Sequence, residues 1–346
     1  HLSLRRQRQM CIRDSSMNTK NHTVGILGSG WIAEKMAITL AGMKGYECLA
    51  IASRTQAHAD SFAAKHGIAR AYGSYEELVK DNDVELVYIA TPHALHYEHA
   101  RICIEHNKPV LCEKAFTANA REAETLLELA ESRKVFITEA IWTRYMPLSL
   151  KVIELVRQGV IGHPYTLTAN LCYPVSEKER MQRPELAGGS LLDLGVYALN
   201  FAAMIYGDEI ERTVSACTKT DTGMDDQESI TQFFSNRRMA VLNSSMYPRS
   251  DRKGIISGDK GYIIVENINN PEIARVYDLD YRLTAEYPAP PQITGYEYQV
   301  IASFEALEQG LLESPYMPHR ETLRIMRIMD ELRRDWGVTF PNDEII

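Results

Sequence analysis

The chain has 346 residues, of which 45% are hydrophobic and 24% are charged, a balance typical of folded globular proteins and not of disordered ones. Its formal net charge of −8 disfavours binding to nucleic-acid phosphates or to anionic membranes. The sequence contains no uninterrupted apolar run of about 18 residues, so no membrane-spanning helix is predicted. The length predicts about two domains.

The first 16 residues differ in composition from the rest of the chain. They are rich in arginine and lack the apolar centre of a secretory signal. We expect a leader foreign to the natural protein, with Met17 as the natural start; the alternative is an Arg-rich organelle presequence. The six cysteines are scattered and form no C-x-x-C pair, which predicts reduced thiols in a cytoplasmic protein.

From His22 onward, short apolar runs alternate with segments of helical periodicity. The near-continuous apolar strands predict a parallel sheet that helices cover on both faces, in a doubly wound order. We therefore expect a nucleotide-binding Rossmann domain at residues 17–141. Its expected strands are residues 24–27, 48–52, 86–90, 110–112 and 135–138, and its expected helices are residues 32–43, 56–65, 75–80, 93–106 and 119–132.

After Trp142 strands dominate, and short turns join several of them. Such an order predicts an α+β domain at residues 142–346 with a large, mostly antiparallel sheet. The expected strands are residues 165–171, 213–219, 228–234, 239–246, 254–257 and 262–265, and the expected helices are residues 148–158, 191–205, 296–311 and 319–335. One face of this sheet is expected to be open. Because such a face needs cover, we expect a homodimer or a higher homo-oligomer.

A G-x-G-x-x-A element follows the first expected strand and opens the first helix. There the first glycine permits a tight turn, the second lets a phosphate approach the backbone, and the alanine lets the helix pack closely on the sheet. The free N–H groups of the helix would hold a pyrophosphate. The residues expected to bind the cofactor here are Gly28, Ser29, Gly30, Trp31, Ile32 and Ala33.

The second expected strand ends at Ser53 and Arg54, where a site that prefers NAD usually places an acidic residue. A guanidinium can bind a 2′-phosphate with two hydrogen bonds. We therefore predict NADP as the cofactor in preference to NAD. The alternative is that Arg54 is a solvated loop residue.

Three further segments predict the chemical site. Glu113 and Lys114 end a buried strand, where ligands bind in such sheets. Asp193 and Tyr197 stand four residues apart, on one face of an otherwise apolar helix. The third segment lies where the domains meet, and its candidate substrate-binding residues are Trp142 and Arg144. The structural alternatives are a salt bridge for Lys114 and a buried hydroxyl that the backbone satisfies for Tyr197.

His93, His96 and His99 are spaced three residues apart, which resembles a zinc-binding pattern. We expect no metal, because neither an accompanying carboxylate set nor a known zinc motif is present. His93 and His96 are better explained as a polar rim beside the nicotinamide.

The sequence resembles the Gfo/Idh/MocA oxidoreductases over nearly all of residues 17–346, and within them the branch of dimeric dihydrodiol dehydrogenases and NADP-dependent D-xylose dehydrogenases. Several motifs carry the resemblance in the same order along the chain. They are the glycine turn, residues 53–54, 71–78, 88–93, 113–114, 139–145 and 192–197, and the segment 337–341.

The resemblance implies that Lys114, Asp193 and Tyr197 are catalytic and that Thr91, Pro92 and His93 border the cofactor. Tyr197 points to the dihydrodiol and xylose branch, because many sugar dehydrogenases of the family have histidine there. Ala115 stands where the family has a proline whose peptide bond is often cis. Because a non-proline cis bond costs about 2.5–4 kcal/mol, a trans bond is the alternative here.

These observations predict an NADP(H)-dependent oxidoreductase that transfers hydride between the nicotinamide and a carbinol or anomeric carbon of a sugar, polyol or cyclic diol. Tyr197 would be the general acid and base, Lys114 would lower its pKa, and Asp193 would hold Lys114 or the substrate. The alternatives are a non-catalytic NADP-binding regulator of sugar metabolism and an oxidoreductase of anhydrosugars or inositols.

Overall fold

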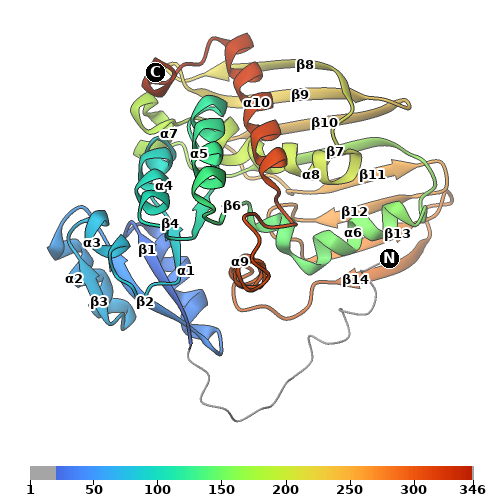
Figure 1. The fold of residues 1–346 in the computed structure, drawn as a ribbon. Helices are drawn as coiled ribbons and strands as arrows, with labels where there is room; N and C mark the ends of the chain where they lie inside the picture. Colours follow the sequence, from blue (N-terminus) through green and yellow to red (C-terminus); the bar gives the residue numbers. More distant parts are fainter. Residues whose placement is uncertain (1–20, 345–346) are drawn as a thin grey trace.

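The computed structural model describes residues 21–344, so the expected leader at residues 1–16 lies outside the described residues. The first half of the chain forms a six-stranded parallel sheet in the order β3-β2-β1-β4-β5-β6. This is the predicted doubly wound sheet (Figure 1). Its strands are β1 (His22–Leu27), β2 (Tyr46–Ala52), β3 (Arg70–Tyr72), β4 (Leu86–Ile89), β5 (Val110–Glu113) and β6 (Ile137–Ala140).

Helices join these strands, and their ends carry recognisable caps. The helices are α1 (Trp31–Gly42), α2 (Gln56–His66), α3 (Tyr75–Val79), α4 (His96–Glu105) and α5 (Ala120–Arg133). Thr55, Ser74 and Asn119 each accept a hydrogen bond from a backbone N–H group in the first turn of the helix that follows. Strand β3 was missed by the sequence analysis, because three half-buried residues carry no readable alternation.

The second sheet has eight strands in the order β14-β13-β12-β11-β7-β10-β9-β8. All its neighbours are antiparallel except β7 and β10, as the predicted mostly antiparallel sheet requires. The strands are β7 (Pro164–Cys172), β8 (Ile210–Lys219), β9 (Asp225–Phe234), β10 (Arg238–Ser245), β11 (Gly254–Gly258), β12 (Tyr262–Glu266), β13 (Ile273–Tyr277) and β14 (Leu283–Pro288). Strands β13 and β14 were not predicted from the sequence; β14 is a largely exposed edge strand.

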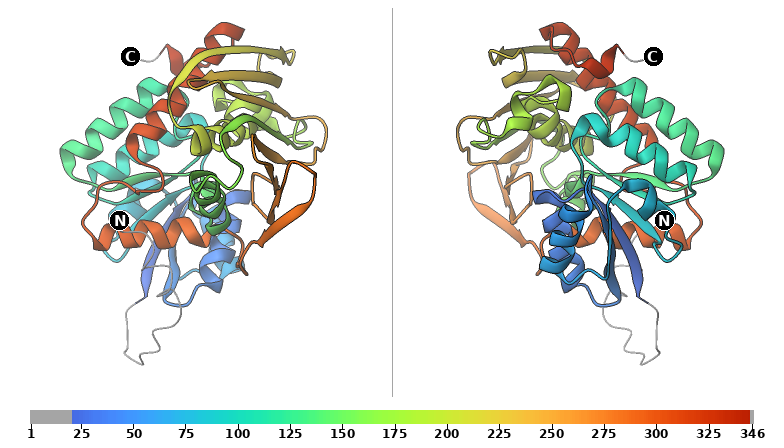
Figure 2. Two further views of the ribbon diagram at one scale, coloured as in Figure 1. Left: turned by 90° about the vertical axis from the view of Figure 1, so that its right-hand side faces the viewer. Right: turned by 90° about the vertical axis from the view of Figure 1, so that its left-hand side faces the viewer.

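One face of the second sheet is covered by α6 (Pro147–Arg157) and α8 (Val196–Tyr206), as the views in Figure 2 show. Helix α8 is apolar on nearly all sides because it is enclosed by the sheet and by α10 (His319–Trp336). The segment Pro184–Tyr206 has the length and hydropathy of a membrane-spanning helix, but 83% of its most apolar window is buried inside the fold. A π-helical turn, Leu191–Gly195, precedes α8 within the single helix that the sequence predicted.

The last two long helices of the chain, α9 (Glu297–Glu308) and α10, return to the first sheet. The N–H of Ile137 in β6 donates to the carbonyl of Leu312 at 3.1 Å, and α10 packs against α5. In Figure 1, α10 stands between α5 and the second sheet. The segment that contains α9 and α10 therefore ties the two sheets together.

Candidate active site

The candidate site lies at the carboxyl edge of the first sheet, where ligands bind in doubly wound folds. Strand β1 neighbours both β2 and β4, so the order of the sheet reverses at this strand. The glycine turn follows β1, and the expected catalytic segment follows β5. Both expected parts of the site therefore emerge from the same edge.

The glycine turn has the geometry that a pyrophosphate site needs. Gly28 has a φ of +101°, and a Cβ there would lie 2.8 Å from the carbonyl oxygen of Ala90, so only glycine fits. A Cβ on Gly30 would meet nothing within 4 Å, so the approach to the N-terminus of α1 is open. No side chain caps this helix, and Ala33 is fully buried against the sheet. These residues fit a dinucleotide cofactor.

Ser53 and Arg54 lie beside this turn, as the motif predicts. The hydroxyls of Ser29 and Ser53 are 3.0 Å apart, which joins the turn to the end of β2. Arg54 is exposed and, within residues 21–344, forms no ion pair. Its guanidinium is therefore available for an anionic ligand.

Lys114 and Asp193 form the centre of the candidate chemical site. The Nζ of Lys114 donates to a carboxylate oxygen of Asp193 at 3.0 Å and to its backbone carbonyl at 2.8 Å. Both side chains are largely buried, at 12% and 9% exposed. The peptide bond between Lys114 and Ala115 is cis, so the trans alternative does not hold.

Arg180, which the sequence analysis did not identify, also binds Asp193. It lies on α7 (Glu179–Gln182), and its two terminal nitrogens contact the two carboxylate oxygens at 2.8 and 3.0 Å. Burial raises the pKa of Asp193, but Lys114 and Arg180 outweigh that effect and hold it well below its usual range. Asp193 is therefore an ionised carboxylate shared by two cations.

Tyr197 lies next to this pair, one helical turn after Asp193. The ammonium of Lys114 sits over its ring, 5.1 Å from the centroid. Burial, followed by the nearby Tyr296 and Glu113, raises the pKa of Tyr197 well above its usual value. The net shift of this pKa is therefore upward, and Lys114, whose ammonium is directed to Asp193 and faces the ring of Tyr197, is not among its main causes.

Glu113 is buried beside the cluster. The hydroxyl of Tyr88, in the middle of β4, donates to its carboxylate, and the N–H of Lys114 donates to the other oxygen at 3.2 Å. Burial raises the pKa of Glu113 to about 7. A tyrosine in a fully buried strand needs a partner for its hydroxyl, and this requirement is the signal by which Tyr88 could have been found.

The expected substrate residues fall into two different surroundings. Trp142 stacks on Tyr296 with ring centroids 4.1 Å apart, and it interacts with Tyr197. Arg144 is only 7% exposed and donates to Asn200 at 2.6 Å and to Glu321 at 3.1 Å. The structure therefore places Trp142 at the cluster and commits the guanidinium of Arg144 to α8 and α10.

The predicted histidine rim is only partly present. His96 has no exposed surface, and its ring nitrogens lie 2.8 Å from the carbonyl of Ala115 and 2.7 Å from that of Thr91. His96 therefore supports the loop and offers no rim, because both nitrogens are engaged by the backbone. His93, preceded by Pro92, is half-buried, and burial followed by Lys114 lowers its pKa to about 3. Thr91 binds His99 at 2.9 Å.

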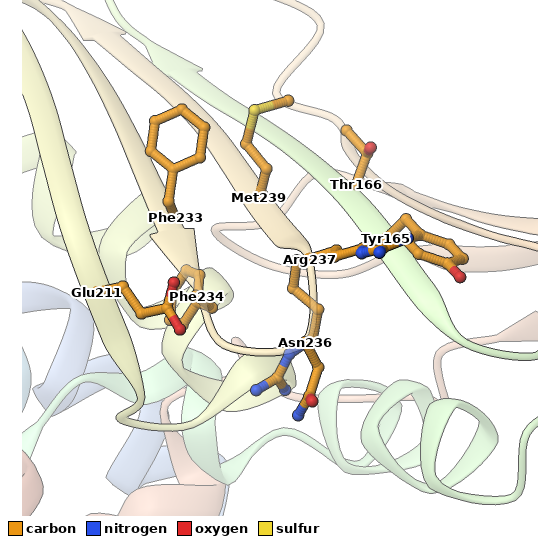
Figure 3. Close-up of a pocket in the computed structure, with 9 residues that line it drawn as sticks. Tyr165, Thr166, Glu211, Phe233, Phe234, Asn236, Arg237 and Met239 are labelled. Carbon is orange, nitrogen blue, oxygen red and sulfur yellow. The ribbon is translucent and has the colours of Figure 1, made fainter.

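Residues 21–344 contain no group of three or more His, Cys, Asp or Glu side chains arranged to hold a metal ion. A hollow of about 630 Å³ lies elsewhere, at the turn between β9 and β10. Figure 3 shows Phe233 and Met239 projecting from adjacent strands at this hollow. None of the expected site residues lines it.

Comparison with known proteins agrees with this geometry. Residues 22–140 match the model of the oxidoreductase family with an NAD-binding Rossmann fold, and residues 149–264 match that of the GFO/IDH/MocA C-terminal domain. The chain belongs to the Gfo/Idh/MocA oxidoreductase family. The resemblance stated from the sequence is therefore confirmed.

Relatives in the family include trans-1,2-dihydrobenzene-1,2-diol dehydrogenases. Those of Danio rerio and Homo sapiens are both 32% identical, and the match covers 92% of this chain and 98% of each relative. The aldose-aldose oxidoreductase of Caulobacter crescentus has the same fold, with a TM-score of 0.82 at 21% identity over 91% of this chain and 97% of its own. The 3-ketoreductase KijD10 of Actinomadura kijaniata, solved with NADP and TDP-benzene, has a TM-score of 0.81 at 22% identity, covering 91% and 97% of the two chains.

Proposed function

We propose that this oxidoreductase uses NADP(H) to interconvert a secondary alcohol, or the anomeric carbon of a sugar, and the corresponding carbonyl compound. The substrate class is a cyclic diol, a sugar or a polyol. The observation that carries the proposal is the buried Lys114–Asp193 pair beside Tyr197, at the edge of the sheet where the glycine turn also emerges. The names of the dihydrodiol dehydrogenases and the aldose-aldose oxidoreductase support the substrate class.

The glycine turn would hold the pyrophosphate of the cofactor, and Thr91, Pro92 and Glu113 would border its nicotinamide half. Arg54 would bind the 2′-phosphate, which supports NADP over NAD because the guanidinium has no acidic partner among the described residues. When bound, the cofactor supplies or accepts a hydride at the nicotinamide ring. The side chains of this chain then have to orient the substrate and move one proton.

Tyr197 would exchange that proton with the substrate oxygen. A tyrosine hydroxyl is ordinarily protonated near neutral pH, and the raised pKa keeps that of Tyr197 so, which lets it donate to a carbonyl oxygen that becomes a hydroxyl. The ammonium of Lys114 would stabilise negative charge on that oxygen. Asp193 would hold Lys114 in place, and Trp142 with Tyr296 would provide an apolar wall for a ring.

An NADP(H)-coupled screen of trans-dihydrodiols, aldoses, inositols and anhydrosugars, run in both directions, tests this function. We expect turnover of at least one class and its loss in Lys114→Met. Tight NADPH binding without turnover of any class would contradict the enzyme and favour the non-catalytic regulator. Turnover of anhydrosugars or inositols alone would favour the other alternative.

The cofactor preference has its own test. We expect wild type to have the higher kcat/KM with NADP, and Arg54→Asp to lower the ratio of the NADP value to the NAD value roughly tenfold to a hundredfold, since hydrogen bonds to charged groups are worth about 1.5–3 kcal/mol. The exposed cation Lys65, on the helix that follows Arg54, pairs with Glu34 and provides a control in Lys65→Met. An unchanged preference in Arg54→Asp would contradict the assignment.

We also propose that the second sheet forms a homodimer or higher homo-oligomer through its open face. A row of cross-strand neighbours runs over its centre on the side away from α8, and all of these side chains are β-branched. The row is Val214, Thr231, Val241, Thr168, Ile255 and Ile264. Solution scattering at micromolar concentration should show an oligomer that Val241→Lys weakens; a wild-type monomer would contradict it.

Two further proposals concern the chain as a whole. We place the boundary between the nucleotide-binding domain and the substrate domain between Ile141 and Trp142, because β6 ends at Ala140. We also infer a cytoplasmic location, which the free thiols of Cys48, Cys103, Cys112, Cys172 and Cys217 support. Fractionation of cells that express the full chain tests the location.

A further inference from the structure

A segment of the second domain reaches over the glycine turn. Lys178 lies immediately before α7, and its Nζ is 5.6 Å from the centroid of the Trp31 ring. Trp31 is the first residue of α1 and follows Gly30 directly, and its side chain is 63% exposed. Lys178 therefore stands above the end of α1 that would face the pyrophosphate.

The surroundings of Lys178 leave its charge uncompensated. Within the described part of the chain it forms no salt bridge, and the charged groups that act most on its pKa are two cations, Arg180 and Lys114, and one anion, Asp193. Partial burial, followed by the nearby Arg180, lowers its pKa, and Lys114 adds to this effect while Asp193 opposes it. Asp193 is already shared by Lys114 and Arg180. A bound anion would relieve this concentration of positive charge.

The position of Lys178 is fixed by the segment that carries it. Two residues further on, Arg180 binds both carboxylate oxygens of Asp193. Met181 is fully buried, and its carbonyl accepts a hydrogen bond from the N–H of Gly189 at 3.0 Å. The segment is therefore anchored beside the catalytic cluster, and it carries Lys178 close to the Trp31 ring at the start of α1.

We propose that Lys178 binds the pyrophosphate of the cofactor from the side opposite the N-terminus of α1, so that the second domain completes the nucleotide site. A diphosphate matches this position because it carries two negative charges and can contact a cation and the backbone N–H groups of the glycine turn together. The inference rests on the proposed use of a dinucleotide. The segment that carries Lys178 also carries Arg180, which binds Asp193. One segment would therefore contact both the phosphate site and the catalytic cluster.

Binding titrations with three probes test the proposal without using activity. NADPH and 2′-phospho-ADP-ribose contain the pyrophosphate, whereas 2′-AMP lacks it. We expect Lys178→Met to weaken binding of the first two probes about tenfold, the effect of losing one charge-assisted hydrogen bond, and to leave 2′-AMP within twofold. Lys178→Arg should retain most of the affinity.

Lys35→Met is the matched control, because the Nζ of Lys35 lies at the same 5.6 Å from the Trp31 ring but belongs to α1 itself. It should leave all three affinities within twofold. Lys178 is exposed, so thermal unfolding should show that Lys178→Met folds like wild type.

The remaining outcomes separate this inference from the proposed function. If wild type binds NADPH and Lys178→Met binds it equally well, the role of Lys178 is overturned and the cofactor site stands. Equal weakening of 2′-AMP, or an effect on the substrate KM alone, would also overturn a contact with the pyrophosphate. If wild type binds neither dinucleotide probe, the cofactor proposal fails, and the role of Lys178 fails with it.

Discussion

The nucleotide half and the catalytic half of the proposed site are built in different ways. The nucleotide half uses backbone and empty space: Gly28 permits the turn, Gly30 leaves an open approach, and Arg54 is exposed without an ion pair among the described residues. The catalytic half uses buried charges that already bind one another, with Asp193 held by Lys114 and Arg180.

Because of this difference, the two halves should respond differently to substitutions. The glycine turn binds through its backbone, so the change it cannot accept is an added Cβ at Gly28. The buried charge cluster depends on every member, since removing one partner leaves another charge uncompensated. We therefore expect substitutions in the catalytic half to change turnover, and those in the nucleotide half to change binding.

The largest expected effect is in the catalytic half. Tyr197→Phe removes the hydroxyl that would exchange the proton, so kcat should fall by about 10²–10⁴ while the Kd for NADPH stays within twofold. Steady-state kinetics and a fluorescence titration measure the two quantities. Tyr206→Phe, at the other end of α8, is the control and should keep kcat near the wild-type value. Near-normal turnover in Tyr197→Phe would refute the role.

A second prediction concerns the stability of the buried acids at the edge of the sheet. Burial raises the pKa of Glu139 from its ordinary 4.5 to about 7, so between these values the native state binds more protons than the unfolded chain. This group therefore lowers stability as the pH rises through that window. Glu139→Gln should remove the loss and gain on the order of 2 kcal/mol at pH 8 relative to pH 5.

Urea unfolding of wild type and Glu139→Gln at the two pH values checks this prediction. Glu128→Gln, an exposed position on α5, is the control and should show the wild-type dependence on pH. If Glu139→Gln and wild type change equally between pH 5 and pH 8, the raised pKa of Glu139 is wrong.

The smallest expected effect on stability separates the two glycines of the nucleotide half. Gly28→Ala should cost about 1–2 kcal/mol of unfolding free energy, because of its positive φ and the nearby carbonyl of Ala90. Gly30→Ala should leave thermal unfolding unchanged but weaken NADPH binding, because its methyl group would enter the open approach. Equal stability of the two variants, or unweakened NADPH binding by Gly30→Ala, would contradict this division.

Much of the first domain could be predicted from the sequence. Buried parallel strands read as continuous apolar runs, and the glycine turn fell where the motif required it. Strands β3 and β14 were missed because a short or exposed strand has no strong periodicity. Lys114, Asp193 and Tyr197 were named from their positions at a strand end and on one helix face, and again from the resemblance, and the structure brings them together.

The features that could be read from the sequence are local: the alternation of strands and helices, the glycine turn, and the residue types at the carboxyl edge of the sheet. Periodicity and turn chemistry act over a few residues, so they can be read from the chain. Which charges meet became known from the folded chain alone. Arg180 joins Asp193, and Arg144 is directed to Asn200 and Glu321, through contacts between distant segments. Such contacts depend on how the elements pack, and no local pattern encodes them.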